Sequence, residues 1–206
     1  MKKISCIFTS VLLFLLSSAC FAEPPTAVAG FVLGGKISDF EDKILMGTAM
    51  PIRYRKYLME VEIKKKDGFK SGLLWFGTCT QPNRIIRIKL KYADSSKSFY
   101  NKLLKRFKQR FDEPDEWRGD PFHVVIAWKW SFVDRSGNRI SMILQHNTMD
   151  GEEKMGNALK LTLTDEISRE ADCYEKKHPQ DTQTGARRRM RKRGKGSADW
   201  DSFIPR

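Results

Sequence analysis

Residues 57–76 read YLMEVEIKKKDGFKSGLLWF, a pattern that indicates two strands joined by a turn. Apolar and mostly polar side chains alternate over its first seven residues, as in a strand with one face on a core and one largely in water. Asp67 and Gly68 then predict a tight hairpin turn. The returning segment, 69–76, ends in a run that is apolar on both faces, Leu73, Leu74, Trp75 and Phe76. We therefore expect a hairpin whose second strand is central in an antiparallel sheet.

A third strand and a helix follow this hairpin. Beyond a turn at residues 81–83, apolar positions alternate with cationic ones, which are Ile86, Ile88, Leu90 and Tyr92 against Arg87, Lys89 and Lys91. This pattern predicts a strand with a cationic outer face. Bulky apolar residues then recur every four positions from Phe99 to Phe111, which indicates an amphipathic helix of about four turns. Asp94 is its expected N-cap, and Pro114 stops it.

Upstream of residue 57, the sequence predicts a short strand and a short helix. Residues 31–33 are apolar and end at a glycine turn. Ser38 is expected to cap a helix that runs through Phe40, Ile44 and Leu45, because its hydroxyl oxygen can accept a backbone N–H of the first turn.

Downstream of residue 120, the order of strands and helix repeats without residue-level identity. Alternating apolar residues predict three further strands, over residues 124–132, 140–144 and 159–163. Thr164 is expected to cap a last helix. The predicted fold class is therefore α+β: an antiparallel sheet from two blocks of three strands and a helix, after a short strand–helix preface, with helices packed on one face.

The N-terminus has the three parts of a cleavable secretory signal. Two lysines precede an apolar stretch over residues 4–16, and small residues then lead to Ala22. The apolar run is shorter than the ~20 residues that cross a bilayer, which argues against a membrane anchor. We expect removal of residues 1–22 and a periplasmic or extracellular protein. Lipid attachment at Cys20 is the alternative, although Ser17 stands where lipoprotein signals usually carry a large aliphatic side chain.

Export leaves Cys79 and Cys173 in an oxidising compartment, which favours a disulfide between them. Two buried thiols that pack as small hydrophobes are the alternative. In the chain-entropy model, a bond closing so long a loop stabilises the fold by up to ~5 kcal/mol.

Length and charge indicate one folded unit with a basic tail. Residues 23–179 are enough for a single α+β domain with its own core. Residues 180–206 are polar and rich in arginine, which predicts a disordered basic tail. The chain carries a net charge of +13. The eight basic and three acidic residues from 181 onward supply +5 of this, so the folded part is basic too. Such a protein is drawn to anionic lipid headgroups, polysaccharide or acidic proteins.

Two basic clusters are candidate binding sites for an anionic envelope component or another envelope protein. One lies on the third strand and consists of Arg87, Lys89 and Lys91. The other lies in the tail and consists of Arg187, Arg188, Arg189, Arg191, Lys192 and Arg193. No aromatic side chains interleave with the exposed charges, so nucleic acid is not the expected partner. The tail is either an arm for a polyanion or a membrane surface, or a solvated end.

The sequence contains no nucleophile elbow, no phosphate-binding glycine loop and no spacing typical of metal ligands, so we expect neither a metal nor another cofactor. The leading hypothesis is a non-enzymatic binding or assembly module of the envelope. The second is a hydrolase-like enzyme whose dispersed site includes His123 and His146. The third is a small-ligand carrier with Trp128 and Trp130 in the cavity wall, although their even spacing favours core packing. The tripeptide 118–120, Arg-Gly-Asp, is interpreted as an ordinary turn.

Overall fold

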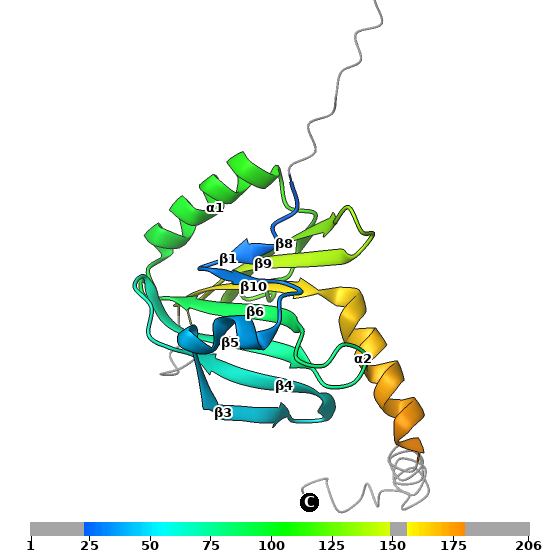
Figure 1. Ribbon diagram of the computed structural model, residues 1–206. Coiled ribbons are helices and arrows are strands. Elements are labelled where there is room, and N and C mark those ends of the chain that lie inside the picture. The colour runs from blue at the N-terminus through cyan, green and yellow to red at the C-terminus, as the bar shows by residue number, and fades with distance from the viewer. Residues whose placement is uncertain (1–22, 149–155, 180–206) are drawn as a thin grey trace, which may run out of the picture.

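The computed structural model describes residues 23–148 and 156–179. In this part of the chain, eight strands form one antiparallel sheet in the order β3-β4-β5-β6-β10-β9-β8-β7 (Figure 1). Their bounds are β3 Ile44–Ile52, β4 Arg55–Ile63, β5 Phe69–Gly77, β6 Ile85–Tyr92, β7 Glu116–Trp117, β8 Val125–Val133, β9 Arg139–Asn147 and β10 Gly156–Leu163. A separate ribbon and three helices complete the fold: β1 Ala27–Val28, β2 Phe31–Val32, the 3₁₀ helix η1 Ile37–Lys43, α1 Lys97–Phe111 and α2 Thr164–Lys177. The predicted signal peptide (1–22) and tail (180–206) lie outside the described residues.

The sheet consists of two meanders placed side by side. Strands β3 to β6 form the first and β7 to β10 the second, and they meet where β10 pairs with β6. At this junction Leu161 lies opposite Ile88 and Leu159 lies opposite Leu90. All strand pairs are antiparallel, which confirms the predicted α+β class with an antiparallel sheet.

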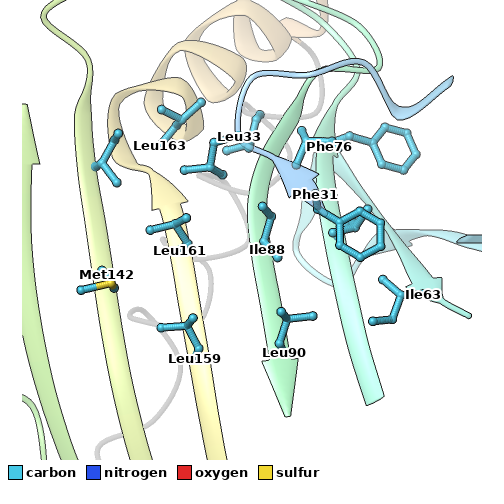
Figure 2. Packing of buried hydrophobic residues seen from close by; sticks show 14 of the residues in the cluster. Phe31, Leu33, Ile63, Phe76, Ile88, Leu90, Met142, Leu159, Leu161 and Leu163 are labelled. Carbon is cyan, nitrogen blue, oxygen red and sulfur yellow. The ribbon is translucent and has the colours of Figure 1, made fainter. Parts of the chain in front are cut away.

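One face of the sheet carries the hydrophobic core. A row of paired side chains crosses six strands and is almost fully buried: Val61, Leu74, Ile88, Leu161, Met142 and Trp130. Burial of one such aliphatic side chain contributes ~1.5–3 kcal/mol. Phe31 and Leu33, from the N-terminal segment, lie against the side chains of β5 and β6 (Figure 2).

The two α-helices occupy different places on the sheet. α1 lies on the core face, where Phe107 contacts Trp130 and Phe111 contacts Phe132, with ring centroids 5.9 and 5.7 Å apart. α2 starts directly after β10 at the end of the sheet and contacts β4, β6 and β9 (Figure 1). The core face is therefore covered by α1 and by the N-terminal segment, while α2 closes one end.

The preface differs most from its prediction, because a strand replaces the end of the expected helix. Only the 3₁₀ helix η1 forms, and Ile44 begins β3 instead of continuing a helix. β3 has no alternating pattern, since it is an edge strand with a register shift between Leu45 and Met50. Thr48 fills this irregularity: its hydroxyl donates to the Leu45 carbonyl at 2.7 Å and accepts the Glu62 N–H at 3.0 Å. A bulged edge strand cannot be recognised from periodicity.

The predicted helix caps were placed on the wrong residues. At α1 the cap is Ser96, whose hydroxyl accepts the Phe99 N–H at 3.1 Å, while Asp94 accepts the N–H of Ser96. Ser38 lies inside η1 rather than before it. Thr164 is already helical, and its hydroxyl donates to the Arg139 carbonyl at 3.1 Å. Asp94 thus has a local backbone partner in place of the helix terminus, whereas the Thr164 hydroxyl binds a carbonyl of β9 that is distant in sequence.

Candidate anion-binding face

The face of the sheet opposite the core, which we call the open face, carries the cationic residues predicted on the third strand. Arg87, Lys89 and Lys91 alternate with buried side chains along β6 and are themselves half-buried. Sheet pairing places Arg87 between Trp75 and Thr162. The predicted strand and its cationic outer face are therefore present, in the middle of the sheet.

Lys160 joins this group, and sequence reasoning missed it as a site residue. In the pairing of β10 with β6, Lys160 lies directly opposite Lys89. Its ammonium donates to the Gln145 side-chain oxygen at 3.0 Å. Burial lowers the pKa of Lys160, and the charges of Lys89 and Arg87 lower it further. The period-two pattern had marked Lys160 as outward-facing, but only the strand order could reveal its neighbour.

Arg87 is held in one orientation by two contacts. Its guanidinium lies over the Trp75 ring, 3.9 Å from the centroid, and its Nε donates to the Thr162 hydroxyl at 2.9 Å. Trp75 is fixed in turn, because its indole N–H donates to the Glu60 carboxylate at 3.2 Å. Burial, and then the charge of Arg55, lower the pKa of Arg87 to about 10, so the group remains charged at neutral pH.

Beside these cations the open face is hollowed. The hollow has a volume of about 790 Å³ and lies between the β4–β5 hairpin and the adjoining parts of β6, β9 and β10. Among residues 23–148 and 156–179, seven lysines line it, together with the carboxylate of Glu62. The lysines are Lys64, Lys65, Lys66, Lys70, Lys89, Lys91 and Lys160. A concave surface lined by one sign of charge concentrates the field, so the arrangement attracts anions.

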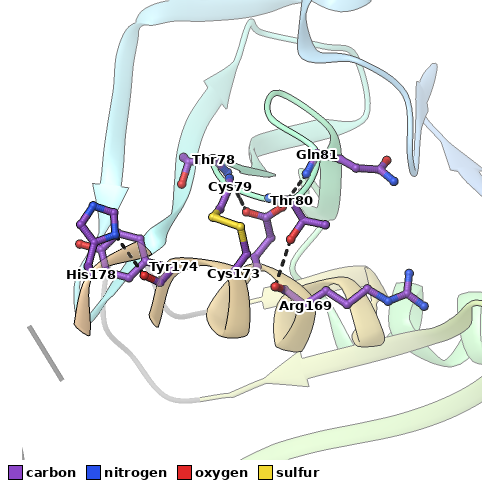
Figure 3. Close-up of a disulfide and its surroundings, with 9 residues drawn as sticks. Thr78, Cys79, Thr80, Gln81, Arg169, Cys173, Tyr174 and His178 are labelled. Atoms are coloured by element: carbon purple, nitrogen blue, oxygen red, sulfur yellow. Dashed lines mark hydrogen bonds between the residues drawn. A yellow bond between two sulfur atoms is a disulfide. The ribbon is translucent and has the colours of Figure 1, made fainter. Parts of the chain in front are cut away.

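The predicted disulfide is present and lies apart from this hollow. Cys79, in the loop after β5, is bonded to Cys173 of α2, with the two Cα atoms 5.9 Å apart (Figure 3). Next to it, the fully buried carboxylate of Glu170 accepts four backbone N–H groups from residues 78–81 at 2.7–3.0 Å. No room remains for an external anion there, because a Cβ on Gly77 would already lie 2.5 Å from the Glu170 carboxyl carbon. This loop therefore anchors α2 to the sheet.

The histidines proposed for a dispersed catalytic site are placed in different surroundings. His146 is buried, hydrogen-bonds to the side-chain oxygen of Asn157 at 2.8 Å and stacks on Tyr100. His123 packs against the Trp117 ring. Across residues 23–148 and 156–179, no three His, Cys, Asp or Glu side chains gather in a way that could hold a metal ion.

The tryptophans and the Arg-Gly-Asp turn have structural surroundings. Trp130 is buried, and its indole N–H donates to the Asp112 carbonyl at 2.9 Å. Trp128 packs edge-on against Trp117, with centroids 4.9 Å apart. The Asp120 carboxylate accepts backbone N–H groups from the next few residues, Phe122, Val124 and Val125. These contacts agree with core packing for the tryptophans and with a turn at 118–120.

The basic cluster of the tail, Arg187 to Arg193, lies outside the described residues, as does Cys20. Among the helices that the structure describes, none has the length and apolar character needed to span a membrane. Comparison of the chain with models of known families, with curated proteins and with solved structures finds no significant match.

Proposed function

We propose that this protein is a non-enzymatic binding module of the cell envelope, and that the hollow of its open face holds an anionic envelope component. The observation that carries the proposal is the excess of lysine over glutamate among the described residues that line the hollow. Charges of one sign in a concave site raise the local concentration of an oppositely charged ligand. The disulfide between Cys79 and Cys173 is compatible with an exported protein.

The shape of the site favours a protruding anionic group over a flat surface. Lys89 and Lys160 are half-buried on the floor of the hollow. A planar array of headgroups reaches exposed side chains more readily than such a floor. A group that extends from a larger molecule, such as an acidic substituent of an envelope polymer, can enter the hollow and contact these lysines.

The test measures the salt concentration at which the protein elutes from an anionic matrix. It compares two variants that carry the same change of charge in different regions. A Lys89→Glu and Lys70→Glu variant reverses two charges in the hollow. A Lys105→Glu and Arg106→Glu variant makes the same net change on the exposed side of α1. We expect the hollow variant to elute at clearly lower salt than the α1 variant. Salt screens charges that are far from the bound anion more than charges that contact it, so the lysines of the hollow should contribute most to binding.

Equal elution shifts for the two variants would show that only net charge matters and would contradict the proposal. Circular dichroism of both variants checks that the fold is retained. A further variant, with Arg187, Arg188 and Arg189 changed to glutamine, measures how much the tail contributes to retention on the matrix. If that variant alone abolishes retention, the tail and not the hollow is the binding element.

A further inference from the structure

Two lysines of the hollow form a like-charge pair that the described residues leave uncompensated. Lys89 and Lys160 lie directly opposite each other on neighbouring antiparallel strands. Directly opposed side chains have Cβ atoms only ~4.5–5.5 Å apart, and like charges in this position are destabilising. The ammonium of Lys160 donates to the neutral amide of Gln145. In the part of the chain that the structure describes, no carboxylate lies within ion-pair distance of either lysine.

Another lysine in the same row of the sheet forms an ion pair with a carboxylate on the neighbouring strand. Lys129 of β8 faces Glu116 of β7 across the strand pair, and its ammonium lies 3.2 Å from that carboxylate. Within the described residues, the sheet thus pairs a cation with a carboxylate at its edge and leaves two opposed cations without one in the hollow. This contrast makes the pair of Lys89 and Lys160 a candidate site for an external anion.

Arg87 adds a preorganised donor to this pair. It lies on the same face, two residues from Lys89 along β6. Trp75 fixes its plane and Thr162 accepts its Nε–H, while no acceptor among the described residues binds its two terminal nitrogens. This fork matches two oxygens of one carboxylate or phosphate group. We call Arg87, Lys89 and Lys160 the cation triad.

We infer that the cation triad binds the phosphate group of a phosphomonoester, an inference that rests on the proposed function and names its ligand. Three adjacent cations suit one group that carries more than a single negative charge. A phosphomonoester carries about −1.5 to −2 charges at pH 7 and offers three strong acceptor oxygens. A carboxylate or a phosphodiester carries one charge. Lys89 and Lys160 line the hollow and Arg87 lies beside it, so the rest of an anionic ligand can extend into the hollow.

Calorimetric titration of the chain from residue 23 to residue 206 with three soluble probes tests the ligand class. The probes are glucose 6-phosphate, glucuronate and a methyl phosphodiester of glucose. We expect glucose 6-phosphate to bind at least ~10-fold more tightly than the other two, because one added charge-assisted contact contributes ~1.5–3 kcal/mol. Its affinity should fall between pH 7 and pH 5, as the second phosphate ionisation near pH ~6 is reversed. Equal binding of glucuronate, or an affinity that does not change with pH, overturns the inference.

Two variants locate the site. Lys160→Met keeps the aliphatic stem and removes the charge, and we expect at least ~10-fold weaker glucose 6-phosphate binding. The fold should lose no stability, because the repulsion with Lys89 disappears. Lys65→Met, an exposed rim residue of the same hollow, is the matched control and should change affinity less than ~2-fold. Equal losses in the two variants would mean diffuse attraction and would overturn the triad.

Further arms identify the source of the phosphate and separate this inference from the proposed function. Phosphatidylcholine vesicles with added phosphatidic acid present the monoester on a lipid, and a preference for them over glucose 6-phosphate identifies a lipid ligand. Matrix retention that depends on the hollow, without binding of either monoester, overturns the phosphate site and leaves the proposed function standing. If the hollow variant and the α1 variant are retained equally on the matrix, the proposed function is overturned. The calorimetric titration still decides whether the cation triad binds a phosphate group.

Discussion

Replacing Glu170 by glutamine should weaken this fold strongly while hardly changing the shape of the side chain. The carboxylate of Glu170 is fully buried, and each oxygen accepts two backbone N–H groups. Oε2 accepts those of Thr78 and Cys79, at 3.0 and 2.7 Å, and Oε1 those of Thr80 and Gln81, at 2.9 and 3.0 Å. In the near-isosteric variant Glu170→Gln, an amide nitrogen replaces one oxygen. That nitrogen cannot accept, so two buried N–H groups lose their partner.

The magnitude follows from these two lost bonds. A hydrogen bond to a charged group contributes ~1.5–3 kcal/mol, so the loss is about 3–6 kcal/mol. Part of it is recovered, because the variant no longer buries a charge. We therefore expect the free energy of unfolding to fall by roughly 3 kcal/mol. For a domain of this size, the melting temperature should fall by roughly 6–12 °C.

The assay is urea unfolding followed by tryptophan fluorescence, with the disulfide kept oxidised so that only the hydrogen bonds differ. Glu175→Gln, at an exposed position of the same helix, makes the same chemical change and should alter stability by less than ~0.5 kcal/mol. If Glu170→Gln is no more destabilising than Glu175→Gln, the backbone N–H groups of residues 78–81 do not depend on this carboxylate, and the reasoning is wrong.

Two further predictions concern the disulfide and the turn at Asp120. The bond spans 94 residues in sequence, so the Cys79→Ala and Cys173→Ala double variant should lose about 4.7 kcal/mol in urea unfolding by the chain-entropy model. A variant as stable as the oxidised protein would contradict this. Hydrogen bonds from backbone N–H groups, that of Val125 first, hold the pKa of Asp120 below its ordinary value. Its stabilisation is therefore present above the unfolded pKa near ~4 and lost as pH falls through the folded pKa. The stability gap between the protein and Asp120→Asn should shrink as the medium is acidified, and a gap independent of pH would refute this.

Local periodicity was enough to predict the strands that have one buried face. The alternation around Val61 and Ile88 corresponds to β4 and β6, and the four-residue spacing from Phe99 to Phe111 corresponds to α1. In these segments the side-chain pattern and the backbone period have the same physical cause, which is burial of one face. The disulfide was also predictable, because only two cysteines follow the predicted signal.

The order of the strands was not predictable from such patterns. β10 follows β6 by more than sixty residues and yet pairs with it, so nothing local places Lys160 opposite Lys89. The candidate site could therefore be found only in part: Arg87, Lys89 and Lys91 were predicted together, and Lys160 was missed. Glu170 was missed for a related reason, since its four partners lie about ninety residues away.

The bond between Cys79 and Cys173 turns most of the sheet into a covalent ring. β6, α1, β7, β8, β9 and β10 all lie between its two cysteines. A single cut by a protease anywhere from residue 80 to residue 172 therefore opens the ring without releasing a fragment. The nicked protein would keep its full mass on a non-reducing gel and separate into two pieces only after a thiol is added.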